Sequence, residues 1–225
     1  MDLSPELVRR IRRRALHGLA DAAPCSLIVR HGARTRSRVA LTFDDGPNEL
    51  TPRYLGLLDR LGVRATFFVL GEACLRHPAR LHEIIARGHE VASHGHTHKA
   101  FPSLSAEDLA AELANVRRLL PPSVRGARAI VRPPRGAVSP WSLLRCAAAG
   151  YTTVLWSLDS DDCRTRSVDT IVERASGAQP GDIVLLHEGQ TWTLDALPGI
   201  VASLRAAGRE LVTVGEILGR ADHVE

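Results

Sequence analysis

Short apolar runs alternate with segments of helical character along most of the chain, and this alternation constrains the fold more than any other feature. Strands and helices that alternate in this way build parallel βαβ units. The sequence therefore predicts an α/β fold with about seven parallel strands, a (β/α) barrel short of the full eightfold form. Strands are expected at residues 39–43, 66–70, 89–93, 129–131, 152–156, 182–187 and 210–213, and helices at 51–61, 78–87, 105–120, 139–149, 168–178, 194–207 and 214–220.

The N-terminal residues 1–37 are expected to form a basic helix over residues 1–20 and an arm, ahead of a main domain at residues 38–225. We interpret the helix as a solvated element packed on the domain. Its cluster of arginines also allows peripheral contact with a membrane surface or a partner. No apolar run is long enough to insert into a bilayer, and no apolar segment typical of a signal peptide follows the basic start. We therefore expect a cytoplasmic protein.

Composition narrows the possible partners and cofactors. The four cysteines are far apart and form no CxxC pair, which favours ordinary reduced thiols over a cysteine-rich zinc site. The net charge is +4, but aromatic residues are only 4% and do not interleave with a basic stripe. The sequence therefore predicts no nucleic-acid binding.

Polar side chains gather where the predicted strands end. Because the carboxyl ends of barrel strands meet at one face, where active sites lie, we expect these side chains to converge. Packing alone gives no reason for polar groups to collect at that end. The set is Asp44, Asp45, His94, His98, Arg132, Asp159, Asp162 and His187.

Two of these clusters suggest a metal site. Asp44 and Asp45 place two carboxylates side by side, and their mutual repulsion in a core favours a divalent cation, unless they merely cap a surface turn. One carboxylate can then bind the metal while the other takes a proton. His94 and His98 are four residues apart and can reach one ion, although the spacing also leaves His96 open as a ligand.

Five motifs in order give the chain its resemblance to a known family. They are Thr42–Pro47 (TFDDGP), His94–His98 (HxxxH), Arg132–Gly136 (RPPxG), Asp159–Asp162 (DxxD) and Leu185–His187 (LLH). Over about residues 38–215 the chain resembles the polysaccharide deacetylase family, the NodB-homology group of carbohydrate esterases. The resemblance implies the distorted barrel, a catalytic domain at residues 38–225, and metal-dependent removal of N- or O-acetyl groups from sugars.

The resemblance also implies the metal ligands and the base. Asp45, His94 and His98 would bind a divalent metal, which we expect to be Zn²⁺, with Co²⁺ able to substitute. Asp44 would be the general base toward the attacking water. Arg132 would pair with Asp44 and keep it ionised and oriented.

On the leaving-group side, the resemblance implies that His187 is the general acid and that Asp159 hydrogen-bonds to it and keeps it protonated. The metal and the backbone N–H of Arg135 would stabilise the oxyanion. Leu185 would line the pocket for the acetyl methyl group. These roles complete the implied hydrolytic site.

The chain departs from the family pattern at four positions. Gly95 stands where a loop-stabilising Ser or Thr is usual, so we expect a more mobile loop, and Glu188 replaces a common Asp. Cys163 replaces a Trp of the acetyl pocket, which predicts a wider pocket or one completed by Trp156 or Trp192. Arg135 replaces an aromatic residue, and its guanidinium is suited to an anionic group on the substrate.

Taken together, the sequence predicts a metal-dependent hydrolase that cleaves a linear amide, removing the N-acetyl group from an N-acetylaminosugar in an oligosaccharide or glycoconjugate. One alternative is a deformylase of a lipid-linked aminosugar, which the basic N-terminal helix and Arg135 would suit. Another alternative, of a different class, is an inactive glycan-binding protein. The carbohydrate substrate is the only partner that the motifs require.

Overall fold

The computed structural model describes residues 27–120 and 129–219, and the helix expected at residues 1–20 lies outside them. The described strands form one sheet in which every pair of strands runs parallel. Their order is β1-β6-β5-β4-β3-β2-β8-β7, and β9 also pairs with β2. The strands are β1 (Ile28–Val29), β2 (Arg38–Asp44), β3 (Thr66–Val69), β4 (Glu90–Ser93), β5 (Ala129–Val131), β6 (Tyr151–Val154), β7 (Leu158–Asp159), β8 (Ile183–His187) and β9 (Glu210–Val212).

The predicted barrel-like α/β fold is confirmed, and the strand count is slightly higher than expected. All seven predicted strands are present, and two strands of two residues each, β1 and β7, are added at the ends of the sheet. A two-residue strand is too short to leave a periodic pattern. β1 belongs to the residues that we assigned to an N-terminal arm, and it pairs with β6.

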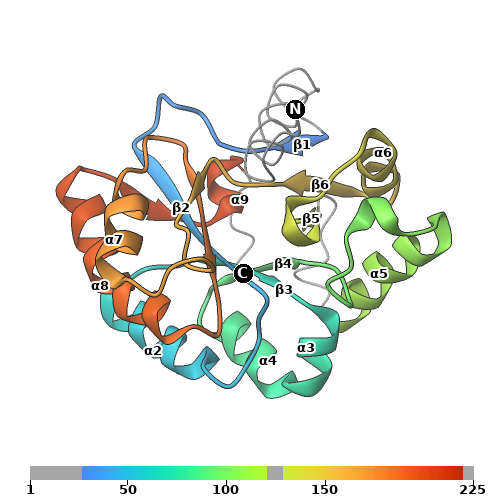
Figure 1. Cartoon of the computed structure of the whole chain (residues 1–225), viewed down its shortest axis with the longest axis horizontal. Helices are drawn as coiled ribbons and strands as arrows, with labels where there is room; N and C mark the ends of the chain where they lie inside the picture. The colour runs from blue at the N-terminus through green and yellow to red at the C-terminus, as the bar shows by residue number, and fades with distance from the viewer. Residues whose placement is uncertain (1–26, 121–128, 220–225) are drawn as a thin grey trace, which may run out of the picture.

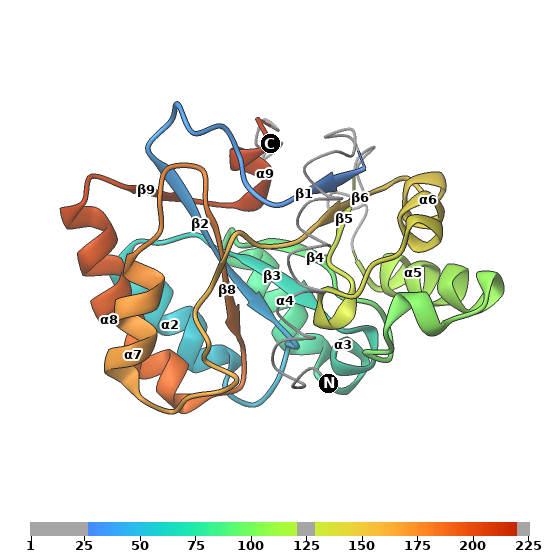
Figure 2. The same cartoon turned by 45° about the horizontal axis from the view of Figure 1, so that its top comes forward.

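The sheet curls so that its first strand approaches the other edge. An antiparallel bridge joins His31, just after β1, to Asp182, just before β8. The Gly32 N–H donates to the Gly181 carbonyl at 2.8 Å, and Arg34 forms an ion pair with Asp182 at 2.7 Å. Figure 1 shows helices α2 to α8 arranged around the outside of the curled strands, and Figure 2 shows β2 crossing the middle of the molecule.

The helices follow the predicted pattern with one addition. Ser105 caps the helix that begins at Ala106, because its hydroxyl accepts a hydrogen bond from the Asp108 N–H at 3.1 Å. The added helix is α3, whose six residues are too few for a clear amphipathic signal. The helices are α2 (Thr51–Leu61), α3 (Gly71–Arg76), α4 (Pro78–Ala86), α5 (Ala106–Leu119), α6 (Pro140–Ala148), α7 (Val168–Ser176), α8 (Thr191–Ala206) and α9 (Val214–Ile217).

Two apolar clusters occupy the two faces of the sheet. The larger cluster lies between strands and helices and includes Phe43 of β2 and Leu58 of α2. The inner cluster takes one residue from each of six strands and one from α9: Ala40, Phe68, Ala92, Ile130, Val154, Ile183 and Val214. Because side chains alternate along a strand, residues two positions beyond these also face inward. This alternation positions the candidate site.

Candidate active site

The inner face of the sheet ends in polar side chains. On β2, Asp44 follows Ala40 and Thr42 on the same face, so it points inward at the end of the strand. By the same step of two residues, His94 follows Ala92, Arg132 follows Ile130, and His187 follows Ile183 and Leu185. β2 and β8 pair in register, with Asp44 opposite His187. Strand periodicity therefore brings together four residues that are far apart in the sequence.

Asp45, His94 and His98 form a compact group that fits a metal ion. The Asp45 Oδ1 atom lies 3.5 Å from His94 Nε2 and 3.3 Å from His98 Nε2. Ligand atoms arranged tetrahedrally around one Zn²⁺ lie roughly 3.4 Å from one another. Asp45 Oδ1 is buried and has no hydrogen-bond partner among the described residues, so an electron pair is available for a cation. The donor set and its spacing therefore fit a divalent metal such as zinc.

The protonation state of His94 also suits a ligand. Its Nδ1 lies 2.8 Å from the Arg132 carbonyl oxygen, which assigns the ring proton to Nδ1 and leaves Nε2 as the free electron pair. Burial lowers the pKa of His94, and His98 and Arg132 act in the same direction, whereas Asp44 and Asp45 oppose them. A neutral imidazole is the form that binds metals.

Local backbone conformation places the other two candidate ligands. Asp45 and His98 both adopt left-handed conformations, with φ of 74° and 61°. At Asp45 this turn follows β2 directly, so two adjacent carboxylates project in different directions and serve different partners. His96, which the spacing left open as a ligand, lies elsewhere: a Cβ atom at Gly71 would sit 2.0 Å from its Nδ1. Of the three histidines in this loop, the close group with Asp45 contains His94 and His98.

Asp44 is held by a buried arginine, as the sequence predicted. Arg132 Nη1 donates to Asp44 Oδ1 at 2.6 Å and to Thr42 Oγ1 at 2.8 Å, and Nη2 donates to the Leu155 carbonyl at 3.1 Å. Its guanidinium also lies 3.9 Å from the ring centre of Phe68. Arg132 is fully buried, and Asp44 is nearly so. The second carboxylate oxygen, Oδ2, lies 3.8 Å from His94 Nε2 and faces the metal group.

The partner of His187 is Asp162, and the expectation that Asp159 would fill this role is wrong. Asp162 Oδ1 lies 2.7 Å from His187 Nδ1, and Oδ2 accepts from the His187 N–H at 2.7 Å. Asp159 instead accepts hydrogen bonds from the Asp161 N–H and from Arg164, both at 2.9 Å. The reason is a turn: β7 ends at Asp159, and the left-handed residue Asp161 reverses the chain so that Asp162 reaches β8.

The charge state of His187 fits a proton donor. Burial by itself lowers its pKa, but hydrogen bonds with Asp162 and Cys163 and the charges of Asp162 and Asp44 outweigh burial and raise the pKa to about 11. The imidazole is therefore protonated at neutral pH. Thr193 Oγ1 donates to Asp162 Oδ2 at 2.8 Å and helps to hold the buried carboxylate in place.

The expected substrate-binding residues form two groups around these candidate catalytic side chains. On the His187 side, Trp192 donates to the Asp162 carbonyl at 2.8 Å, Cys163 is exposed, and Leu185 is buried in β8. On the Arg132 side, the Trp156 ring packs against the turn that contains Arg135: a Cβ atom at Gly136 would lie 2.7 Å from that ring. Arg135 itself is exposed, with a φ of 59°.

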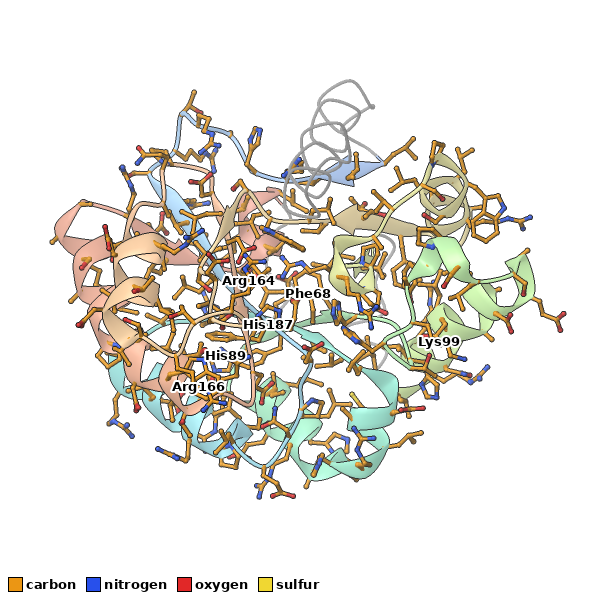
Figure 3. The ribbon with its side chains drawn as sticks, in the orientation of Figure 1. Phe68, His89, Lys99, Arg164, Arg166 and His187 are labelled. Atoms are coloured by element: carbon orange, nitrogen blue, oxygen red, sulfur yellow. The ribbon has the colours of Figure 1, made fainter. Side chains whose placement is uncertain are left out.

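Figure 3 shows how the labelled side chains are distributed over this face. His187 and Phe68 lie near the middle of the molecule. Arg164 and Arg166 lie toward the α7 and α8 side, and Lys99 lies toward α5. Arg166 contacts the Trp192 ring, with 5.0 Å between its guanidinium carbon and the ring centre. In this view Arg164 and Arg166 lie to one side of His187, and Lys99 lies to the other.

Two buried glutamates were not anticipated as parts of the site. Glu188 lies against the Asp44–Asp45 turn, where a Cβ atom at Gly46 would collide with its carboxylate, and Thr51 Oγ1 donates to it. Burial raises the pKa of Glu188 to about 7. Glu112 holds the loop that carries His94 and His98. A sequence signal for Glu112 exists, since it stands in the apolar stripe of α5 between Leu109 and Val116.

Comparisons with known proteins agree with this arrangement. Residues 31–154 match the family model described as polysaccharide deacetylase. The chain is 35% identical over 187 residues to a peptidoglycan-N-acetylglucosamine deacetylase of Bacillus cereus, covering 80% of this chain and 87% of that protein. A crystal structure of a peptidoglycan N-acetylglucosamine deacetylase superposes with a TM-score of 0.82 at 29% identity, covering 87% of this chain and 94% of the other.

A second relative is longer than the present chain. The peptidoglycan-N-acetylglucosamine deacetylase PgdA of Listeria monocytogenes is 32% identical over 189 residues, which are 83% of this chain. The matched region spans only 40% of that protein. Among the described residues, no helix is both long and apolar enough to span a membrane.

Proposed function

The chain belongs to the polysaccharide deacetylase family, and we propose that it is a metal-dependent hydrolase that removes acetyl groups from N-acetylated aminosugars in a glycan. One observation carries the proposal. A metal-ligand group, a carboxylate paired with a buried arginine, and a protonated histidine all lie at one end of the same sheet. Hydrolysis of an amide needs these three functions, because carbonyl activation, water deprotonation and leaving-group protonation must occur in one place.

The cation would be held by Asp45, His94 and His98. When bound, a divalent cation supplies Lewis acidity, which polarises the amide carbonyl and makes water easier to deprotonate. The burial of His94 and the free Oδ1 of Asp45 prepare this site for a cation. The same donor set accepts Zn²⁺ or Co²⁺.

The two proton transfers are assigned to Asp44 and His187. Asp44 accepts a proton from the attacking water as the oxygen bonds to the carbonyl carbon, and Arg132 stabilises the carboxylate form beforehand. His187 gives its proton to the amide nitrogen as the carbon–nitrogen bond breaks, and Asp162 stabilises the imidazolium that performs this step. The products are acetate and a free amine on the sugar.

The remaining elements orient the acyl group. Arg135 is left-handed in the turn that follows β5, and we propose that its backbone N–H donates to the developing oxyanion. Leu185 lies two residues before His187 on the inner face of β8, where its side chain suits the acetyl methyl group. Trp192 is held against Asp162 and would limit the pocket beside the leaving group.

N-acetylglucosamine in a peptidoglycan-like glycan is the substrate class that we favour. The names of both relatives support this choice, since each is a peptidoglycan-N-acetylglucosamine deacetylase. Arg135 is exposed beside the site, and its guanidinium suits an anionic group carried by the same glycan. A formyl group on an aminosugar remains the second substrate to compare, because it would use the same catalytic groups.

The direct test is acyl release by metal-stripped protein from N-acetylglucosamine oligomers and from peptidoglycan fragments. Each substrate is assayed with and without added zinc or cobalt, beside Asp44→Asn, and acetate and formate are measured separately. We expect acetate only when metal is present and no release by Asp44→Asn. Release of formate but not acetate would replace the proposal with deformylation. Glycan binding without any release would support a binding protein instead.

A further inference from the structure

The loop that carries two of the metal ligands has an unusual backbone. Residues 94–98 leave β4 and turn through Gly95, with a φ of 83°, to His98, with a φ of 61°. The His94 N–H remains bonded to the Val69 carbonyl at 2.8 Å, as if the strand continued. The next N–H groups have left the sheet, and those of His96 and Thr97 need other acceptors.

A single carboxylate from α5 supplies those acceptors. Glu112 Oε2 accepts from the His96 N–H at 2.5 Å and from the Thr97 N–H at 2.9 Å, and Oε1 accepts from the Thr97 hydroxyl at 2.5 Å. Glu112 is only 6% exposed. A buried carboxylate is costly unless hydrogen bonds satisfy it, so these three bonds explain why a charge is tolerated here.

The missing side chain at Gly95 belongs to the same arrangement. A Cβ atom at Gly95 would lie 3.1 Å from Glu112 Oε2 and 3.1 Å from the ring of Phe101. The space beside His94 is therefore already occupied by the carboxylate. The loop that we expected to lack an anchor, because a hydroxyl is absent at Gly95, is anchored from α5 instead.

We propose that Glu112 is a positioning residue of the metal centre, which sets the separation of His94 and His98 by fixing the backbone between them. Its carboxylate is bound to the loop and does not belong to the close group of Asp45, His94 and His98. Both residues that it binds, His96 and Thr97, lie between the two ligands, so any shift of this segment moves His98 relative to His94. Groups that orient ligands in this way typically change metal affinity by about 10- to 100-fold when they are removed.

The inference rests on the proposed metal site, and its test measures metal binding directly. Zinc dissociation constants are obtained by competition with a chromophoric chelator, and the visible absorption of the Co²⁺-loaded protein reports ligand geometry. The variants are Glu112→Ala and Glu112→Gln. Gln keeps one oxygen for the two N–H groups and can donate its amide to the Thr97 hydroxyl, so it is the conservative variant.

A matched control separates positioning from simple destabilisation. Leu109→Ala removes a buried side chain one turn earlier on α5, without touching the loop bonds. We expect this variant to lower the melting temperature and to leave zinc affinity and the Co²⁺ spectrum unchanged. Glu112→Ala is expected to weaken zinc binding by about 10- to 100-fold and to alter the Co²⁺ spectrum, with Glu112→Gln recovering most of the affinity.

The outcomes distinguish this inference from the proposed function. If the wild-type chain binds no zinc, the proposed metal site fails. If it binds zinc and folded Glu112→Ala binds equally tightly, or Leu109→Ala weakens binding by the same factor, the positioning role is refuted. Should Glu112→Ala not fold, Thr97→Ala removes one of the three bonds and must then weaken zinc binding measurably for the inference to stand.

Discussion

Arg132 Nη1 lies 2.6 Å from Asp44 Oδ1, and this ion pair is buried at the end of β2. The Arg132 guanidinium is itself held in place, because it also donates hydrogen bonds to Thr42 and to two backbone carbonyls. The carboxylate is therefore fixed from one side, and its other oxygen faces the metal group. A carboxylate held in this way is already oriented before any substrate binds.

Removal of the Arg132 charge should lower the free energy of unfolding more than removal of both the Arg132 and the Asp44 charges. Arg132→Met leaves Asp44 buried without its partner, which typically lowers the free energy of unfolding by about 3–5 kcal/mol. The double variant Arg132→Met with Asp44→Asn removes the unpaired charge, so part of that stability should return. Urea unfolding of the three proteins measures the difference. A double variant less stable than Arg132→Met would contradict the assignment.

Asp162 and Asp159 should behave differently when each is changed to Asn. Asp162→Asn removes the negative charge that keeps His187 protonated, and it should lower kcat by about 10²- to 10⁴-fold, the usual contribution of acid–base catalysis. Asp159→Asn affects a carboxylate that binds Arg164, so kcat should change little. Steady-state kinetics on one acetylated oligomer compare the two. Equal losses in both variants would restore the original assignment of Asp159.

The stability that His187 contributes should depend on pH. Its pKa is raised to about 11 in the folded protein, above the value of about 6.5 for an unfolded chain. Stability from the His187–Asp162 pair is therefore fully present below about pH 6.5 and is lost as the pH rises toward about 11. The difference in unfolding free energy between metal-free wild type and His187→Gln should shrink between neutral and alkaline pH. His82→Gln, at an exposed position, provides the control, and a pH-independent difference for His187→Gln would argue against an imidazolium.

A small thiol reagent should inactivate the enzyme through Cys163. This thiol is exposed, and ligand atoms of Cys163, Asp162 and His187 all lie within 4.8 Å of one another. The other two described cysteines, Cys74 and Cys146, are buried. Methylthiolation should therefore block the proton donor and abolish most acyl release, with recovery after reduction. Cys163→Ser should resist the reagent; equal sensitivity of this variant would place the reactive thiol elsewhere.

The sequence predicted the fold well because buried strands leave a regular apolar pattern, and the same periodicity indicates which way Asp44 points. Ala40, Thr42 and Asp44 share a face by simple alternation, so an apolar pattern that ends in Asp already indicates an inward carboxylate. The family resemblance then separated the roles of Asp44 and Asp45. No pattern in the sequence by itself shows that the backbone turns left-handed between them.

The errors and omissions came from turns and from contacts across the fold. Asp159 and Asp162 stand in one short motif, and only the reversal at Asp161 decides which of them reaches His187. Glu112 is 16 and 15 residues away from His96 and Thr97, and two of its three partners are backbone N–H groups, which carry no residue-type signal. The roles of the expected substrate-binding residues, the cytoplasmic location and the N-terminal helix stay predictions.

The central position of β2 has a consequence for biosynthesis. β2 pairs with β3, its neighbour along the chain, but also with β8 and β9, which a ribosome makes last. A nascent chain that ends at Val154 carries Asp45, His94 and His98 but lacks His187. In that chain one edge of β2 is unpaired, because β8 has not yet been made. Pairing over such separations is slow, and open strand edges attract other chains. The newly made protein therefore exposes an open edge of β2 until its final strands emerge.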